Sequence, residues 1–471
     1  MYDTRNRRAK IQNLLCMILC ISLLACPLRV YATDAGEGQA AEVSWPQGPA
    51  ITAEAGVVME VSTGAVLYEQ NMHAVHYPAS ITKIMTALLA VENCKMNEVV
   101  TVPAEAVYME DKGTHIALDV DEQLTVEQCL YAVMLASAND AAYALAVHVG
   151  GSLDGFVEMM NEKARELGCQ DTVFTNPHGL PDESHVTSAY DMALITKAAL
   201  EYDAFRTVSA ASYYEIPSMP WQKDQICMYN HHKMISKSDY HNSEVFAGKT
   251  GYTIVAGHTL VTCAQRDGME VICVVMKDVK DQLYVDTGNL LAYGLDHFSK
   301  VRIDKDAQFY EDLLKQEDSI YDNSHVSLPD DDSLYVVLPK GADSTELKTE
   351  ITYGENPEDV TVGWYWRDHF VGKTAIQVSS TGGESEIQEE TAGIEEAEEK
   401  EREKKPFPWK YVLWTGIGIV LATGVAGGIA LIRQRSPLNR RQRWEQNERR
   451  KYARRVSRRR RRRRRGRRWF R

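Results

Sequence analysis

One serine and one lysine in the sequence have the spacing of an activated nucleophile. Ser80 and Lys83 enclose two residues, and an apolar run from Ile84 to Ala90 with helical character follows. Residues three apart lie on one face of a helix, so the Lys83 amine can lie beside the Ser80 hydroxyl. A serine becomes a good nucleophile when a neighbouring base takes its proton, and a desolvated lysine beside other cations can act as that base. The plainer alternative is a helix cap followed by a surface lysine, because one short motif often occurs by chance.

A second polar pair interrupts a stretch with helical character. Ser137 and Asn139 flank Ala138 between two segments that we expect to be helices, Val126 to Ala136 and Asp140 to Val147. A short polar break between helices can present a hydroxyl and an amide to a cleft. An ordinary turn between two helices is the alternative interpretation.

A lysine lies just ahead of a predicted β-hairpin. The Lys-Thr-Gly segment at 249–251 leads into two runs rich in β-branched residues, 259–262 and 271–275, which flank an Asp-Gly pair at 267–268. An Asp-Gly pair between such runs is a strong hairpin signal. The pattern places Lys249 near the start of an inner strand, and a loop lysine is the alternative.

Together the three motifs occur in the order Ser-x-x-Lys, Ser-x-Asn, Lys-Thr-Gly, which is the signature of class A β-lactamases and penicillin-binding proteins. The chain resembles most closely the serine D-alanyl-D-alanine carboxypeptidases, which are low-molecular-mass penicillin-binding proteins of peptidase family S11. Three further segments carry the resemblance: Val58 to Gly64 looks like the first strands, Phe174 to Leu180 like a characteristic loop, and His185 to Ala193 like the helix start after that loop. The resemblance covers most of residues 46 to 297.

The resemblance implies catalytic roles for three of these residues. Ser80 attacks the carbonyl between the two terminal D-alanines of a peptidoglycan stem peptide, and Lys83 is its general base. Ser137 relays a proton toward the leaving amine. A D-alanine then leaves, and water resolves the acyl-enzyme.

The same resemblance implies a substrate-binding set: Asn139, Lys249, Thr250, Gly251 and Tyr252. Asn139 orients the substrate amide and Lys83, while Lys249 and Thr250 hold the terminal carboxylate, as a cation and a hydroxyl donor can. The backbone N–H groups of Ser80 and Tyr252 form the oxyanion hole. Penicillins, which are β-lactam antibiotics, are expected to acylate Ser80. The family pattern calls for no metal and no cofactor, and the sequence contains no HExxH.

Three other functions are compatible with parts of this pattern. A β-lactamase needs a glutamate-held water for deacylation, and no segment between Asn139 and Lys249 resembles the loop that carries that glutamate. A D,D-endopeptidase would cleave cross-linked muropeptides instead of pentapeptides. A non-catalytic wall-binding membrane anchor belongs to a different class, and it has no need for a nucleophile together with both lysines. The sequence departs from the family at Ala138, where glycine is frequent.

The helices and strands expected around these residues, together with the family resemblance, indicate an α+β fold of the β-lactamase/transpeptidase type. We expect a mostly antiparallel sheet flanked by helices, with Ser80 at a buried helix start and Lys249 on the sheet edge that faces it. Strand-like runs then follow at 333–338, 361–366 and 373–378. No long helix is expected among them, and so a small β-sandwich is predicted for this part.

The two ends of the chain have the composition of segments that meet a membrane. The basic start, the apolar run Leu14 to Cys26 and the small residues around Ala32 predict a cleaved signal peptide; a lipoprotein box at Cys26 and an uncleaved anchor are alternatives. Tyr411 to Ile432 contains no charged residue and is long enough to cross a bilayer.

Charge is segregated along the chain. The formal net charge is −13, yet residues 433–471 hold 20 arginines and one lysine against two glutamates. This bias places the tail in the cytoplasm and the catalytic domain outside a bacterial cell membrane that the chain crosses once. The tail is expected to bind anionic lipid; an unknown cytoplasmic partner or a nucleic acid is the alternative.

The predicted segments follow from these observations. They are a signal peptide (1–32), a spacer (33–45), the carboxypeptidase domain (46–297), a C-terminal β-domain (298–378), an acidic linker (379–408), a transmembrane helix (409–432) and a basic cytoplasmic tail (433–471).

The overall composition is that of an ordinary globular protein. The 471 residues include 44% hydrophobic and 25% charged residues, which excludes wholesale disorder, a collagen-like fibre and a small disulfide scaffold. None of the nine cysteines has a CxxC or metal-ligand spacing. Cys263 and Cys273 flank the predicted hairpin turn, and the strand register decides whether they pair.

Overall fold

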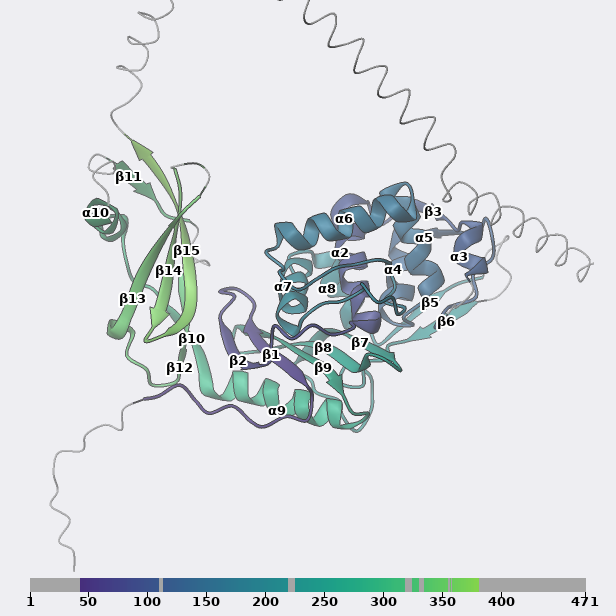
Figure 1. Ribbon diagram of the computed structural model, residues 1–471, viewed down its shortest axis with the longest axis horizontal. Coiled ribbons are helices and arrows are strands. Elements are labelled where there is room, and N and C mark those ends of the chain that lie inside the picture. The colour runs from purple at the N-terminus through teal and green to yellow at the C-terminus, as the bar shows by residue number, and fades with distance from the viewer. Residues whose placement is uncertain are drawn as a thin grey trace, which may run out of the picture. The chain divides into compact units, whose positions relative to one another are not determined.

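A computed structural model of the chain describes residues 43–109, 113–218, 225–317, 324–329, 334–354, 356 and 358–380 (Figure 1). The predicted signal peptide, membrane helix and basic tail lie outside the described residues, as does the acidic linker apart from residues 379 and 380. Among the helices that the structure describes, none combines the length and the apolar composition needed to span a bilayer.

A five-stranded antiparallel sheet is the centre of the catalytic part, with the strand order β2-β1-β9-β8-β7. Its strands are β1 (Ala55–Glu60), β2 (Val66–Gln70), β7 (Val245–Thr253), β8 (Gly257–Arg266) and β9 (Met269–Asp278). Two short strand pairs accompany it: β3 (Val99–Thr101) with β4 (Gln123–Thr125), and β5 (Tyr213–Ile216) with β6 (Ile226–Tyr229).

The sheet buries both faces because apolar residues occupy consecutive positions along its inner strands. In β1, Val57 and Met59 point into one hydrophobic core and Val58 into the other, as the alternation of side chains along a strand requires. Helices α7 (Ala189–Ala199) and α8 (Asp203–Ala210) pack on the face of the sheet that borders the first core. Helix α9 (Gln282–His297) covers the second (Figure 1).

The first core extends into a cluster of helices that carries two of the predicted motifs. These elements are the 3₁₀ helix η1 (Ala79–Thr82), α2 (Lys83–Asn93), α3 (Ala104–Tyr108), α4 (Val126–Met134), α5 (Asn139–Gly150) and α6 (Leu153–Glu166). Helix α4 begins with a capping box in which the Thr125 hydroxyl accepts from the Gln128 N–H and the Gln128 side chain accepts in return from the Thr125 N–H. The predicted helix–break–helix around Ser137 is confirmed: the first helix begins at Val126 as predicted, and the other three bounds differ by one to three residues.

The predicted hairpin is also confirmed. Asp267 and Gly268 form the two-residue turn between β8 and β9 with φ of 51° and 78°, as a type I′ turn requires. The prediction that Lys249 lies near the start of an inner strand is wrong: β7 is an edge strand and Lys249 is its fifth residue. The expected position on the sheet edge is confirmed, because the partner of β7 in the sheet is β8 alone.

The register of β8 and β9 decides the question of a disulfide. Cys263 lies opposite Ile272, one residue out of step with Cys273. The two thiols therefore point to opposite faces of the sheet, into different cores. Both are free and buried.

Beyond α9 the chain is rich in strands, as predicted. Strand β10 (Phe298–Arg302) pairs with β12 (Tyr335–Pro339), and a four-stranded antiparallel sheet has the order β11-β15-β14-β13. The remaining elements are β11 (Ser324–Ser327), η4 (Ser344–Glu346), β13 (Leu347–Tyr353), β14 (Asp359–Trp366) and β15 (His369–Ser380). In β14 every second residue is buried, ending with Trp364 and Trp366.

One feature of this part contradicts the prediction of strands without a long helix. Helix α10 (Ala307–Glu317) stands between β10 and β11. It packs Tyr310 and Leu314 against the strands, in the same core as Trp364. Residues four apart lie on one helix face, and this amphipathic spacing is the signal that the prediction missed.

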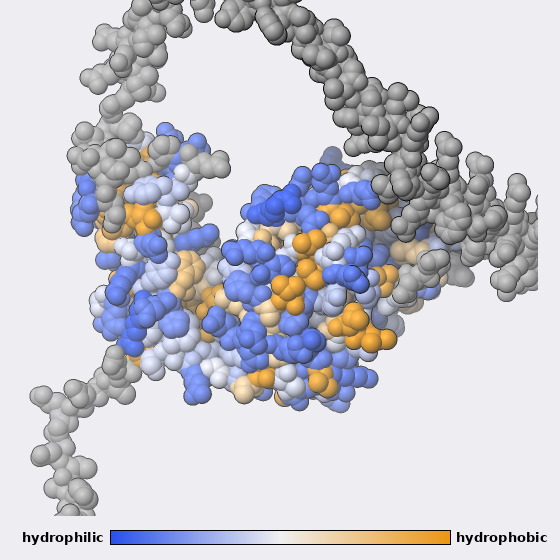
Figure 2. Space-filling model, viewed as in Figure 1, coloured by the Kyte–Doolittle hydropathy of each residue, from blue (hydrophilic) through white to orange (hydrophobic). Residues whose placement is uncertain are grey.

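Hydrophilic residues predominate on the described surface shown in Figure 2, and apolar residues gather there in small, separate patches. This is the expected surface of a domain whose large apolar side chains are mostly in its cores.

Candidate active site

Ser80 lies on a segment that the surrounding structure clamps tightly. The preceding residue, Ala79, has φ of 52°, a left-handed conformation that is costly for a residue with a side chain. The Thr259 hydroxyl donates to the carbonyl of Pro78 at 2.9 Å. A Cβ atom on Gly251 would come within 3.0 Å of the Ser80 nitrogen, and one on Gly179 within 1.8 Å of the Ala79 oxygen. Both glycines are thus required for close packing against the serine.

Lys83 begins α2 and is completely buried. Its Nζ lies 3.2 Å from Ser80 Oγ, 2.7 Å from Asn139 Oδ1 and 2.6 Å from the carbonyl oxygen of His178. The amide oxygen and the carbonyl oxygen can only accept hydrogen bonds, whereas the serine hydroxyl can donate or accept. A neutral amine, with two N–H bonds and one lone pair, therefore satisfies all three neighbours when its lone pair faces Ser80.

The electrostatic surroundings favour that neutral amine. Burial is the main cause that holds the pKa of Lys83 well below its usual range, and the positive charge of Lys249 adds to it. The buried carboxylate of Asp140 acts in the opposite direction. This direction of the pKa shift and this position beside Ser80 are those that a general base requires.

Ser137 and Lys249 form a second contact of the same kind. Ser137 has φ of 58° in the break between α4 and α5. Lys249 Nζ lies 3.1 Å from Ser137 Oγ and 2.9 Å from the carbonyl oxygen of Thr250. Burial lowers the pKa of Lys249 to about 7. Among the described residues, no carboxylate forms an ion pair with this amine, so an anionic ligand would find a cation without a counter-charge here.

The start of α5 holds a loop against the site. The Asn139 N–H donates to the carbonyl of Thr114 at 2.8 Å. The Asp140 carboxylate accepts from the N–H groups of Ile116 and Leu118 at 3.3 and 3.1 Å. A Cβ on Gly113 would come within 2.7 Å of the Asn139 amide nitrogen. The loop therefore packs directly against the residue that contacts Lys83.

A second loop, residues 174–180, supplies the carbonyl that binds Lys83. The Asn176 side chain accepts from the Gly179 N–H at 2.7 Å and donates to the Leu180 carbonyl at 3.0 Å, which closes the loop on itself. The Thr86 hydroxyl donates to the carbonyl of Pro177 at 2.6 Å and ties the loop to α2. Burial lowers the pKa of His178 to about 3, and its ring therefore stays neutral beside Lys83.

His185 joins this loop to the nucleophile segment. Its Nδ1 accepts from the Thr175 N–H at 2.9 Å, and the proton must therefore be on Nε2, which donates to the Thr82 hydroxyl at 2.8 Å. Thr82 in turn donates to the carbonyl of Ala79 at 2.8 Å. Burial lowers the pKa of His185 to about 4, which preserves this neutral tautomer.

A cleft of about 550 Å³ adjoins the Ser137 end of the site. Thr114–Ala117 and Ala136 line it on one side, and strand β6 with His231 on the other. Among the described residues that line it, none is Asp, Glu, Lys or Arg. A neutral part of a ligand bound beside Ser137 fits these walls better than a charged part does.

The structure brings the predicted residues into two hydrogen-bonded groups. Ser80, Lys83 and Asn139 form one group, and Ser137 and Lys249 form the other. Thr250, Gly251 and Tyr252 follow Lys249 on β7. The Tyr252 side chain is 57% exposed and stacks on His258; only its backbone is available to the oxyanion hole assigned by resemblance.

Sequence reasoning missed three residues that shape the site. Asp140 and His185 act through loops, and His178 acts through its backbone carbonyl. His178 and His185 lie in segments that carried the family resemblance, but no sequence motif predicts the contacts that either residue makes. For Asp140 the available signal was its position in the first turn of a helix that follows a functional break.

The proteins similar to this chain belong to the class that the geometry of the site suggests. Residues 41–280 match the sequence model of peptidase family S11, described as D-alanyl-D-alanine carboxypeptidase. The chain is 31% identical over 310 residues to D-alanyl-D-alanine carboxypeptidase DacF of Bacillus subtilis, covering 64% of this chain and 77% of DacF. It is 31% identical over 307 residues to DacC of Escherichia coli, covering 63% and 73%.

A solved structure shows the same fold. Penicillin-binding protein 5 of Haemophilus influenzae superimposes with a TM-score of 0.56 at 25% identity, covering 71% of this chain and 98% of that protein. The stretch that matches the family model, residues 41–280, contains all three motifs with Lys83 and Lys249. The chain belongs to the D-alanyl-D-alanine carboxypeptidase family of serine peptidases.

Proposed function

We propose that the chain is a serine D,D-carboxypeptidase that removes the terminal D-alanine from peptidoglycan stem pentapeptides through an acyl-enzyme on Ser80. The observation that carries this proposal is the position of Lys83. Its amine is buried, and two obligate acceptors at 2.6 and 2.7 Å direct its lone pair at the serine hydroxyl. A buried lysine with a lowered pKa in this position is an activated base and not a structural cation.

The acylation step follows from the two hydrogen-bonded groups. Ser80 Oγ attacks the carbonyl carbon of the penultimate D-alanine while its proton moves to Lys83 Nζ. The oxygen that becomes negative is held by the N–H groups of Ser80 and Tyr252, worth about 3 kcal/mol for one good donor. The C–N bond then breaks, and the leaving amine takes a proton that Ser137 relays.

Lys249 and Thr250 position the substrate in this proposal. The substrate ends in a carboxylate, and Lys249 provides a cation whose partners among the described residues are a hydroxyl and a backbone carbonyl. Binding the carboxylate favours the charged form of Lys249, whose pKa is lowered to about 7 in the free protein. After D-alanine leaves, water attacks the ester and restores Ser80.

Mass spectrometry tests this function directly. The full chain is incubated with a penicillin, and separately with a pentapeptide that ends in D-Ala-D-Ala. We expect a covalent adduct on Ser80 and release of one D-alanine. Ser80→Ala should lose both, whereas Ser184→Ala, which alters an exposed serine, should keep both.

The alternatives give different results in the same experiment. An adduct with cleavage of cross-linked dimers but no D-alanine release indicates an endopeptidase. Rapid penicillin hydrolysis without a lasting adduct indicates a β-lactamase. Folded protein that forms no adduct and releases no D-alanine would leave only the wall-binding anchor.

We also propose that the enzyme is attached to the bacterial cell membrane by one helix at 409–432, after a carboxypeptidase domain (46–297), a β-domain (298–378) and an acidic linker. The signal-like start, the uncharged run and the arginine-rich tail support this proposal. Truncation after residue 408 should release active enzyme from the membrane. Release without truncation, or retention after it, contradicts the proposed anchor.

A further inference from the structure

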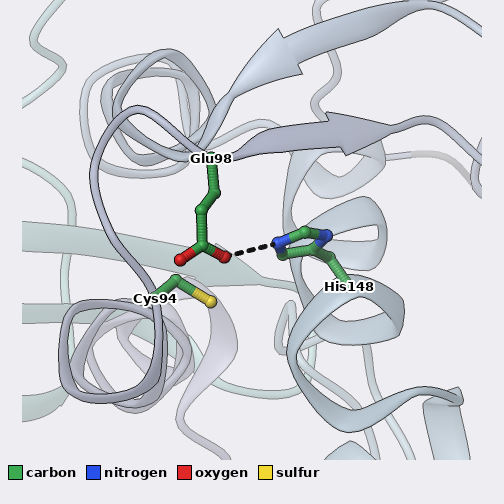
Figure 3. A group of neighbouring side chains, drawn as sticks. All are labelled: Cys94, Glu98 and His148. Carbon is green, nitrogen blue, oxygen red and sulfur yellow. Dashed lines mark ion pairs between the residues drawn. The ribbon is translucent and has the colours of Figure 1, made fainter.

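Three side chains with different metal-binding atoms converge about one helix length from Ser80. They are Cys94, Glu98 and His148, drawn in Figure 3. The thiol, one carboxylate oxygen and one imidazole nitrogen all lie within 4.8 Å of one another, and His148 Nε2 is 3.4 Å from Glu98 Oε2. All three residues are half-buried, which leaves the group open to solvent on one side.

Each of the three side chains is held by its own element. Cys94 is the C-cap of α2, and its N–H donates to the Ala90 carbonyl at 3.0 Å. Glu98 closes a turn in which its carboxylate accepts from the Lys95 N–H at 2.8 Å. His148 lies in the last turn of α5. The group is therefore fixed by backbone that other contacts already order.

We propose that Cys94, Glu98 and His148 bind a zinc ion, with water as the fourth ligand. Thiolate and imidazole ligands together favour zinc over magnesium or calcium, which prefer oxygen ligands. Zinc binds such atoms at about 2.0–2.3 Å, and tetrahedral geometry then separates the ligand atoms by roughly 3.5 Å. The pair Glu98 and His148 already has that separation, and a pair at the 4.8 Å limit must close by about 1.3 Å.

The local electrostatics favour a cation at this place. The C-terminal ends of α2 and α5 both reach the group, and a helix C-terminus attracts positive charge. The negative charge of Glu98 acts on the neighbouring Cys94 thiol. The positive charge of Lys95 opposes it, but the Lys95 side chain is exposed to solvent.

The position of the site suggests its role. Lys83 and Asn139 are the first residues of α2 and α5, and two of the zinc ligands, Cys94 and His148, lie at the far ends of the same two helices. A metal ion there links the two helices at the end remote from the nucleophile. We assign it a structural role in holding the pair together. This inference does not depend on the proposed reaction.

Cobalt and zinc titrations of the full chain test the site. Co²⁺ is expected to give the near-ultraviolet charge-transfer band of a cobalt–thiolate bond, and Zn²⁺ is expected to remove that band by displacement. Zn²⁺ should raise the melting temperature, because a ligand that binds only the folded state stabilises it. Mg²⁺ should have neither effect.

Matched variants identify the ligands. Cys94→Ser should abolish one equivalent of the band, and Glu98→Gln and His148→Gln should weaken Zn²⁺ binding by more than about 100-fold, since even loss of an outer-shell partner costs 10–100-fold. Cys227→Ser removes another accessible thiol and should leave both the cobalt band and the zinc-dependent rise in melting temperature unchanged. The proposal is wrong if wild type gives no band, or if Cys94→Ser keeps the full band and the zinc-dependent rise in melting temperature. If Cys94→Ser does not fold, His148→Gln decides the question: the proposal is wrong if that variant keeps the Zn²⁺ affinity of the wild type.

Discussion

Asn139→Asp tests the general-base assignment with almost no change in shape. It places a negative charge on the atom that lies 2.7 Å from Lys83 Nζ. At an effective dielectric constant of about 20, a full charge at that distance attracts the ammonium form of Lys83 by about 6 kcal/mol. That energy corresponds to a factor above about 10⁴ in the equilibrium between ammonium and amine.

The realised effect is smaller, because the carboxylate shares its charge between two oxygens and is itself buried. We expect acylation of Ser80 at neutral pH to fall by at least about 100-fold, since the pKa of Lys83 rises and the neutral base becomes rare. The lost rate should return by about tenfold for each unit of increasing pH, until half of Lys83 is neutral.

Stopped-flow measurement of penicillin acylation across pH reads out both effects. Asn139→Ala is the matched control, because it removes the acceptor without adding a charge and should lose rate with little pH slope. Thermal unfolding checks that both variants fold. Acylation by Asn139→Asp at the wild-type rate with a flat pH profile would refute Lys83 as the base.

Two further predictions concern Lys249 and the close packing around Ser80. Because the pKa of Lys249 is about 7, the free enzyme loses its carboxylate-binding cation above that pH, and kcat/KM for a peptide ending in a carboxylate should fall by about tenfold per unit there; the same peptide with an amidated end should show no such fall. Gly179→Ala should stop acylation and lower the free energy of unfolding by more than about 1 kcal/mol, because its Cβ would overlap the Ala79 carbonyl. Gly168→Ala is the control, because Gly168 has nearly the same positive φ and no atom lies near its Cβ. In urea unfolding it should lower the free energy of unfolding only by the cost of the left-handed backbone, and in acylation assays it should keep its activity. Equal behaviour of the two variants would contradict the packing argument.

The sequence predicted those features of the site that depend on local spacing. Ser80 and Lys83 are three residues apart in one helical segment, and Asp267-Gly268 is a turn signal by itself. The contacts that complete the site join residues far apart in the chain: Lys83 meets Asn139 across 56 residues and the His178 carbonyl across 95. Such contacts depend on how helices pack, and a backbone carbonyl acceptor leaves no trace in residue type.

The same reason explains the features that were missed. The position of Lys249 within β7 depends on where pairing with β8 begins, which residue preferences do not fix. Cys94 and His148 are close only because α2 and α5 end at the same place. Helix α10 was overlooked because strand-rich neighbours on both sides outweighed its own apolar spacing.

Because Lys83 has three hydrogen-bond partners, the reactivity of Ser80 also shows whether the segments around it have folded together. One hydrogen-bond partner is in the same helical segment, one begins α5 and one lies in the loop at 174–180. An amine that lacks these partners and is open to water regains its ordinary pKa and its charge. The serine therefore becomes nucleophilic only after three distant segments have docked. An unfolded chain therefore carries an inert hydroxyl, and a labelled penicillin counts only the molecules that have finished folding.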